Sequence, residues 1–286
     1  MAVAPRWDVL KKSTLQNKKS DPSGKGSCMK KIWVTALASY KEEVHKLMSL
    51  LKPYGLDVKG AFYEDDLERL SWIKERDGII DRGTALWLIL ASGSDLIAPS
   101  IRYGLSLLSL TVLAKRGLHF PRMIATVERE PCDSASLPTA LKGAECISLT
   151  NPALASKTVA RAHAPAGEIA VDYRLDTHGS HQIGQWFEVG PEKGSWDGCM
   201  FGVEGAQIVF HAAGPKGGLP DRATLNYPSK GLEVKLGDRT YVTWAARNEL
   251  TSELSYFVKV EGYPASIIFG PYAGEDEAEI YKLQLI

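Results

Sequence analysis

The 286-residue sequence lacks the features that would attract a charged polymer or cross a membrane. Lysine plus arginine and aspartate plus glutamate are equal at 34 each, so the chain has no net charge at neutral pH. Nucleic acids and anionic membrane surfaces bind proteins through clustered positive charge, so we expect neither as a partner. The longest apolar run, between Arg102 and Lys115, is far shorter than the roughly 20 residues that a helix needs to cross a bilayer. We therefore expect no membrane-spanning segment.

Cysteine is scarce as well. The four cysteines form no CxxC pair, which argues against both a disulfide framework and a zinc knuckle; they are Cys28, Cys132, Cys146 and Cys199. Residues 1–28 contain no apolar core of the kind found in a secretory signal. We expect these residues to form a flexible tail and the fold to begin near Met29. Together, these patterns predict a reduced, cytoplasmic protein.

What is present indicates two domains of different class. At 44% hydrophobic residues, the chain is long enough for two separate cores. Residues 29–150 alternate strand-like and helix-like segments, which is typical of a parallel sheet with crossover helices. Residues 151–167 are rich in Ala, Ser, Pro and Gly and are predicted to be a linker. Residues 168–286 consist of short alternating runs separated by Gly- and Pro-containing turns, which predicts an antiparallel β-sandwich.

Within the first domain, local signals place two of the helices and the central strand. Ser39 and Glu42 have the spacing of a capping box, which predicts a helix starting there. The acidic cluster 64–66 would favour a second helix start, because carboxylates stabilise the positive end of a helix. The run 84–90 is apolar on both faces, as expected of a strand covered by helices on both sides.

The carboxyl ends of these strands are where a doubly wound sheet binds ligands. Hydroxyl and acidic residues follow three of the predicted strands, and they could bind an anionic or ribose-containing ligand. The same residue types also serve as caps and turns, and the first strand lacks the glycine fingerprint of dinucleotide sites. The candidate ligand-binding residues are Ser39, Tyr40, Glu64, Asp65, Ser92, Ser94, Arg102 and Tyr103.

The order of segments over residues 29 to about 150 resembles a Toll/interleukin-1 receptor (TIR) domain. The resemblance rests on the acidic loop, the Trp- and Ile-containing segment "LERLSWIKERDGIIDR", and the strand and helix "LWLILASGSDLIAPSIRYGLSL". Several flavodoxin-like folds share this order of strands and helices. The resemblance implies a parallel sheet of that kind.

In catalytic TIR domains, a glutamate on the last of these helices is essential for cleaving NAD. Aligning "RYGL" with the Arg-Tyr-Glu-Leu typical of the family puts Gly104 at that position. Glycine cannot stabilise an oxocarbenium-like charge or transfer a proton. We therefore predict that this helix packs rather than catalyses, with Gly104 allowing close approach to a neighbouring backbone. Three carboxylates on nearby loops remain as substitutes: Glu64, Asp65 and Asp95.

The second domain offers weaker candidates. Asp176, His178 and His181 are zinc-binding residue types, but their loose spacing favours a solvated turn, and we predict no metal site. His211 alternates with apolar neighbours and is expected to be a hydrogen-bonded strand residue. The loop 214–220 is expected to be a flexible turn. Trp196 lies in the polar loop "EKGSWDG", so we expect it to be exposed and to contact a partner.

These observations favour a non-catalytic signalling or ligand-sensing protein, with a TIR-like domain that senses a nucleotide-type ligand or mediates assembly. The β-sandwich would recognise a protein partner, and assembly into homo-oligomers is also expected. No catalytic residue and no bound cofactor are predicted, although NAD or a related nucleotide is the ligand class that the resemblance implies. The alternatives are a divergent NAD glycohydrolase or nucleotide-processing enzyme and, third, a carbohydrate-binding protein.

Overall fold

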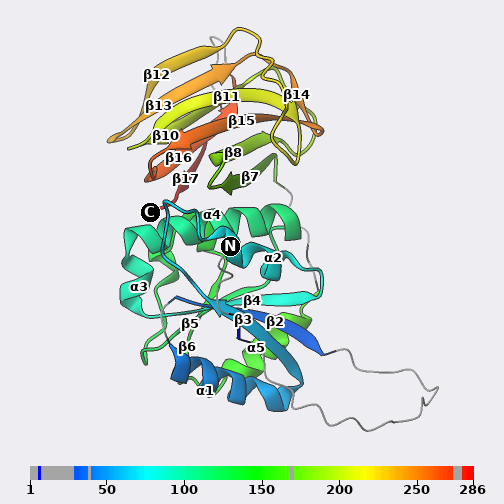
Figure 1. The fold of residues 1–286 in the computed structure, drawn as a ribbon, viewed down its shortest axis with the longest axis vertical. Helices are drawn as coiled ribbons and strands as arrows, with labels where there is room; N and C mark the ends of the chain where they lie inside the picture. The colour runs from blue at the N-terminus through cyan, green and yellow to red at the C-terminus, as the bar shows by residue number, and fades with distance from the viewer. Residues whose placement is uncertain (1–5, 8–28, 38–39, 166, 168–170, 273–278) are drawn as a thin grey trace, which may run out of the picture.

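The computed structural model describes residues 6–7, 29–37, 40–165, 167, 171–272 and 279–286. These residues form an α/β domain and an all-β domain, with one long helix between them (Figure 1). The predicted fold class, an α/β domain followed by an antiparallel β domain, is therefore confirmed in this coarse form.

A parallel sheet forms the centre of the first domain. Its strands occur in the order β3-β2-β4-β5-β6, one of the two common orders of doubly wound sheets. A short strand, β1 (Arg6–Trp7), adds antiparallel to β3, within the segment predicted to be a tail. The parallel strands are β2 (Lys30–Ala36), β3 (Leu56–Phe62), β4 (Thr84–Ala91), β5 (Arg122–Thr126) and β6 (Glu145–Ser148).

Helices cover both faces of this sheet, as the apolar central strand predicts. On one face lie α1 (Lys41–Leu51) and α5 (Leu154–His163), whose apolar residues join one core with β2 and β4. On the other face lie α2 (Ile73–Ile80) and α4 (Pro99–Arg116) (Figure 1). Helix α5 lies within residues 151–167, which we predicted to be a linker, and packs into the α/β core. The connection between the domains begins after α5.

Two predicted helix starts differ from the structure. The N-cap of α1 is Tyr40, without a side-chain cap bond, and Ser39 lies outside the described residues. The second helix does not begin at the acidic cluster 64–66 but at Ile73. Leu70 lies between the acidic cluster and Ile73 and has φ of 51°, a left-handed conformation that an α-helix cannot include. The intervening residues form hydrogen-bonded turns instead.

The most apolar helical segment is broken in two. The short helix α3 (Gly93–Ile97) ends at Ala98, whose ψ is 122°, and α4 begins at Pro99. Proline disfavours helical geometry in the residue before it and is well suited to a first helical position. The break turns α4 across one face of the sheet, where it is buried nearly all round.

The second domain is a sandwich of two antiparallel sheets, with strand orders β12-β13-β10-β16-β17 and β11-β15-β8-β7. A two-stranded piece, β9 with β14, lies beside them. Residues 176–180 belong to the first strand rather than to the solvated turn that we expected. The strands are β7 (Tyr173–Ser180), β8 (Gly184–Pro191), β9 (Ser195–Trp196), β10 (Cys199–Glu204), β11 (Gln207–Pro215), β12 (Ser229–Leu236), β13 (Arg239–Ala246), β14 (Leu250–Thr251), β15 (Leu254–Glu261), β16 (Ser266–Pro271) and β17 (Tyr281–Gln284).

Helix α4 belongs to both domains. Its buried side chains join one continuous apolar core with residues of both the α/β domain and the sandwich. Polar contacts add to this core: Ser106 donates to the Leu285 carbonyl at 2.8 Å, and the hydroxyls of Thr111 and Thr177 lie 2.6 Å apart. The sandwich therefore rests on α4 (Figure 1). None of the helices in the described part of the chain is long and apolar enough to span a bilayer.

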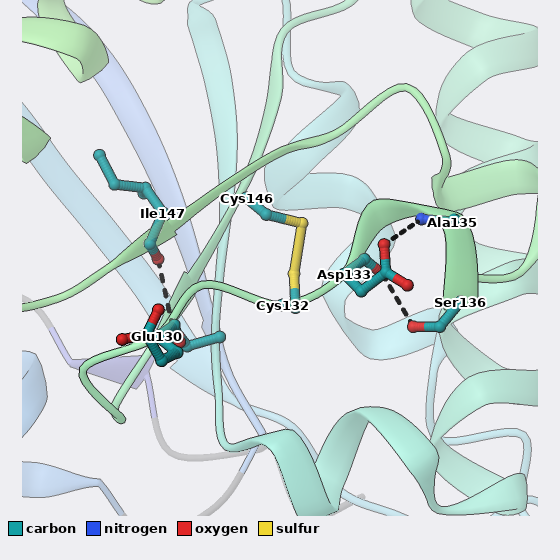
Figure 2. Close-up of a disulfide and its surroundings, with 8 residues drawn as sticks. Glu130, Cys132, Asp133, Ala135, Ser136, Cys146 and Ile147 are labelled. Atoms are coloured by element: carbon teal, nitrogen blue, oxygen red, sulfur yellow. Dashed lines mark hydrogen bonds between the residues drawn. A yellow bond between two sulfur atoms is a disulfide. The ribbon is translucent and has the colours of Figure 1, made fainter.

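One cysteine pair corrects the sequence interpretation. Cys132, in the segment after β5, forms a disulfide with Cys146 on β6, with their Cα atoms 5.6 Å apart (Figure 2). The reduced state that we expected is therefore wrong for Cys132 and Cys146. Cys199 is a free, buried thiol. The disulfide ties the loop at the carboxyl end of β5 to its neighbouring strand.

Candidate functional site

The candidate ligand-binding residues of the α/β domain fall into separate groups at the carboxyl ends of the strands. Tyr40, Ser92 and Ser94 belong to a network after β2 and β4. Glu64 and Asp65 lie after β3 and make other contacts. Within the described part of the chain, no hydrogen bond or ion pair joins the two groups. Ser39 cannot be placed, because it is not among the described residues.

Asp95 is the centre of the first group. Its carboxylate accepts a hydrogen bond from the Tyr40 hydroxyl at 2.5 Å and from the Ser92 backbone N–H at 2.7 Å. The Ser92 hydroxyl in turn accepts from the Asp95 N–H at 3.1 Å, which completes a capping box on α3. Burial and the bond to Asp95 raise the pKa of Tyr40, so its phenol stays protonated and donates at neutral pH.

A second carboxylate reaches the same turn from the next strand. Glu128, in the exposed segment after β5, accepts a hydrogen bond from the Gly93 backbone N–H at 3.0 Å. Asp95 and Glu128 therefore hold the turn 92–93 from two sides. The sequence contained a signal for Asp95, which follows Ser92 at capping-box spacing. It contained none for Glu128, whose position depends on how β4 and β5 pair.

The acidic loop after β3 is tied to its own surroundings. Glu64 forms an ion pair with Lys74 on α2, and Asp65 accepts from the Ser100 hydroxyl at the start of α4 at 2.7 Å. Glu64 therefore stabilises α2, the next helix in the sequence. Asp65 stabilises α4, which comes later.

Arg102 and Tyr103 are held in structural roles. The Arg102 guanidinium donates to the carbonyls of Leu96 at 3.0 Å and Ser136 at 2.8 Å, which fixes the α3–α4 break against a neighbouring loop. Tyr103 is fully buried, and its hydroxyl accepts a bond from the Gln185 amide on β8. Tyr103 therefore contacts the sandwich rather than the carboxyl ends of the parallel strands.

Gly104 allows a close approach, but not to a backbone as we expected. A β-carbon at this position would stand 1.9 Å from the Tyr63 hydroxyl and 3.4 Å from Leu67. The Tyr63 hydroxyl is buried and has no hydrogen-bond partner among the described residues. Burial, with the nearby Asp65 and Glu75 carboxylates, raises its pKa, so the phenol is neutral. The space next to this helix position is filled by an aromatic side chain.

Trp196 is not the exposed platform that its polar loop suggested. Its side chain is 9% exposed, because β9 pairs with β14 and the indole stacks on Tyr281 with ring centroids 6.5 Å apart. The prediction of exposure is wrong. The largely buried indole leaves little surface for the partner contact that we expected.

The segment "DTHGSHQ" divides between a strand and a turn. Asp176 and His178 lie on β7 and face Glu188 on β8, whereas His181 lies in the exposed turn that follows. The loop 214–220 is anchored rather than free, since the Gly217 N–H donates to Glu188 at 2.9 Å. His211 is a hydrogen-bonded strand residue as predicted, with Nδ1 2.6 Å from the Tyr256 hydroxyl.

Comparison with known proteins gives no family assignment. A scan against protein-family models found no match. A search of curated proteins found no significant relative.

Proposed function

We propose that the chain is a non-catalytic ligand-sensing or signalling protein. In this proposal, the TIR-like domain binds a nucleotide-type ligand at the carboxyl ends of β2 and β4, and the sandwich presents a partner-binding surface. The Tyr40–Asp95–Ser92 network lies between the first and third parallel strands, where a doubly wound sheet with this strand order reverses direction. Ligands of such sheets bind outside that reversal point.

The observation that carries the proposal is the position of α4. Its first turn is bonded to the ligand-side loops through Arg102 and Ser100. Further along, Tyr103, Ser106 and Thr111 are bonded to the sandwich. A ligand that shifts the α3–α4 break would therefore act on a helix that the second domain contacts directly. A helix bonded to both regions couples two sites when it has two arrangements that each site biases.

The absence of a side chain at Gly104 supports binding without cleavage. With Tyr63 filling the neighbouring space, this helix position offers no carboxylate to an oxocarbenium-like transition state. Glu64 and Asp65, the substitutes considered first, are bonded to Lys74 and Ser100.

The test uses NAD and ADP-ribose with the full chain. Calorimetry is expected to detect binding of at least one of them, while chromatography detects no release of nicotinamide from NAD. Tyr40→Phe removes one hydroxyl from the network and is expected to weaken binding. Tyr54→Phe, at an exposed tyrosine after α1, is the matched control and should bind like the wild type. Failure of both ligands to bind at millimolar concentration would reject the proposal.

A second candidate function, cleavage of a nucleotide, is favoured by the two carboxylates at this edge. Asp95 and Glu128 both bond the turn 92–93 and could supply the acid that Gly104 lacks. Nicotinamide release that is lost in Glu128→Gln, with Glu64→Ala as control, would establish this function in place of the first.

A further inference from the structure

Three potential metal ligands lie on the outer face of the β11-β15-β8-β7 sheet, away from the carboxyl ends of β2 and β4. The register pairs Asp176 directly with Glu188 across β7 and β8, and His178 lies two residues along β7 on the same face. One ligand atom from each residue lies within 4.8 Å of the others. Asp176 is 6% and Glu188 4% exposed. Like charges directly opposite each other on paired strands repel, and a cation beside them offsets the repulsion.

Each carboxylate uses one oxygen for structural bonds and directs the other toward the cluster. Glu188 Oε1 accepts from the Ser255 hydroxyl at 2.8 Å and from the Gly217 N–H at 2.9 Å. Asp176 Oδ1 accepts from the Thr177 N–H at 2.7 Å. This leaves Glu188 Oε2 and Asp176 Oδ2 facing His178 and Lys115. Bonds of this kind orient the ligands of a metal site and are formed before the metal binds.

Among the described residues, the remaining carboxylate oxygens contact groups that a metal ion could displace. Glu188 Oε2 lies 2.6 Å from His178 Nε2, and Asp176 Oδ2 forms an ion pair with the Lys115 ammonium at 2.8 Å. The Lys115 side chain is 41% exposed and comes from the last turn of α4, so it can swing into solvent.

We infer that Asp176, His178 and Glu188 form a binding site for a divalent transition-metal ion, for which Zn²⁺ is the probe. One imidazole nitrogen and two carboxylate oxygens are ligands that Zn²⁺ accepts, and three protein ligands leave a fourth position open. The ion enters from the side of Lys115, displaces its ammonium from Asp176, and breaks the His178–Glu188 bond. This inference replaces our expectation of a solvated turn and is independent of the proposed function.

The test measures Zn²⁺ binding to the full chain by calorimetry and by metal analysis after dialysis. The expected result is one ion per chain, with affinity at least about tenfold weaker in His178→Ala. His181→Ala removes a histidine three residues away in the exposed turn and is the matched control, with unchanged affinity. Binding that is lost in His181→Ala but kept in His178→Ala would reveal a surface site and overturn the inference.

Lys115→Met separates a metal site from a purely structural ion pair. If Lys115 competes with the metal, its removal tightens Zn²⁺ binding by about fivefold or more, the effect of one positive charge about 4 Å away. If the cluster is only structural, this variant lowers thermal stability and binds no Zn²⁺. Absence of binding at millimolar Zn²⁺ in both the wild type and Lys115→Met, with circular dichroism confirming that both are folded, would reject the site.

Discussion

The Tyr63 hydroxyl occupies the space that a side chain at position 104 would need. A β-carbon on Gly104 would stand 1.9 Å from that oxygen, and Tyr63 is too deeply buried to move aside freely. Tyr63 and Gly104 therefore constrain each other, and a larger residue at one position requires a smaller one at the other.

This relationship predicts a non-additive pair of substitutions. Gly104→Ala alone is expected to destabilise the protein by about 1–3 kcal/mol through overpacking. Tyr63→Phe removes an unpartnered buried hydroxyl and is expected to be neutral or stabilising. In the double variant, alanine at 104 should cost much less, because the clashing oxygen is gone. Urea unfolding of all four proteins measures the coupling. Additive effects would contradict the proposed contact.

Reduction of the disulfide should loosen the segment after β5, which lies at the carboxyl ends of the parallel strands where we propose that the ligand binds. Cys132 and Cys146 are 14 residues apart in sequence, and the loss of a cross-link closing a loop of this size costs roughly 3 kcal/mol in the chain-entropy model. We expect Cys132→Ser with Cys146→Ser to lower the midpoint of thermal unfolding by several degrees, and a reductant to have the same effect on the wild type. Cys199→Ser is the control for reductant sensitivity. An equal response to reductant in wild type and double variant would show that the bond does not form.

His211 predicts a loss of stability in mild acid. Burial, with the nearby Lys230 ammonium, lowers its pKa from 6.5 to about 4. The unfolded chain therefore binds a proton at higher pH than the folded chain does. As pH falls from about 6.5 to about 4, the free energy of unfolding should decrease by up to about 3 kcal/mol. In His211→Gln, the free energy of unfolding measured with urea should depend less on pH across this range. His45→Gln, at an exposed histidine, should behave as the wild type, and an equal slope in all three would contradict the assignment.

The shared helix predicts that the two domains unfold together. Thr111→Val removes the hydroxyl that meets Thr177 across the interface and is expected to cost about 1 kcal/mol, because a buried hydrogen bond is lost while the Thr177 hydroxyl still donates to the Leu107 carbonyl. The variant should still unfold in a single cooperative transition, and the lost stability should lower the midpoint of that transition. Calorimetry measures it, with the exposed Thr240→Val as control. Two separate transitions would show that α4 does not couple the domains.

The sequence predicted the domain classes and the central strands well, because these depend on local periodicity. The run "TALWLIL" is apolar on both faces and became the central strand β4. The helix start at the acidic cluster failed, since a left-handed residue such as Leu70 is set by the surrounding packing rather than by its own side chain.

The remaining misses depend on pairing between distant segments. Trp196 lies in a polar loop, and only the pairing of β9 with β14 covers its ring. The disulfide depends on β5 and β6 being neighbours. Asp176 and Glu188 become a pair only through the register of β7 with β8. None of these contacts can be derived from the spacing of residues along the chain.

The placement of α4 has a consequence for the order in which the protein can fold during synthesis. The helix leaves the ribosome long before β17, yet Ser106 bonds the carbonyl of Leu285 near the end of the chain. Until the strands of the sandwich emerge, the side of α4 that faces them has no cover. A nascent chain that pauses between the domains would therefore present an apolar helix surface to chaperones.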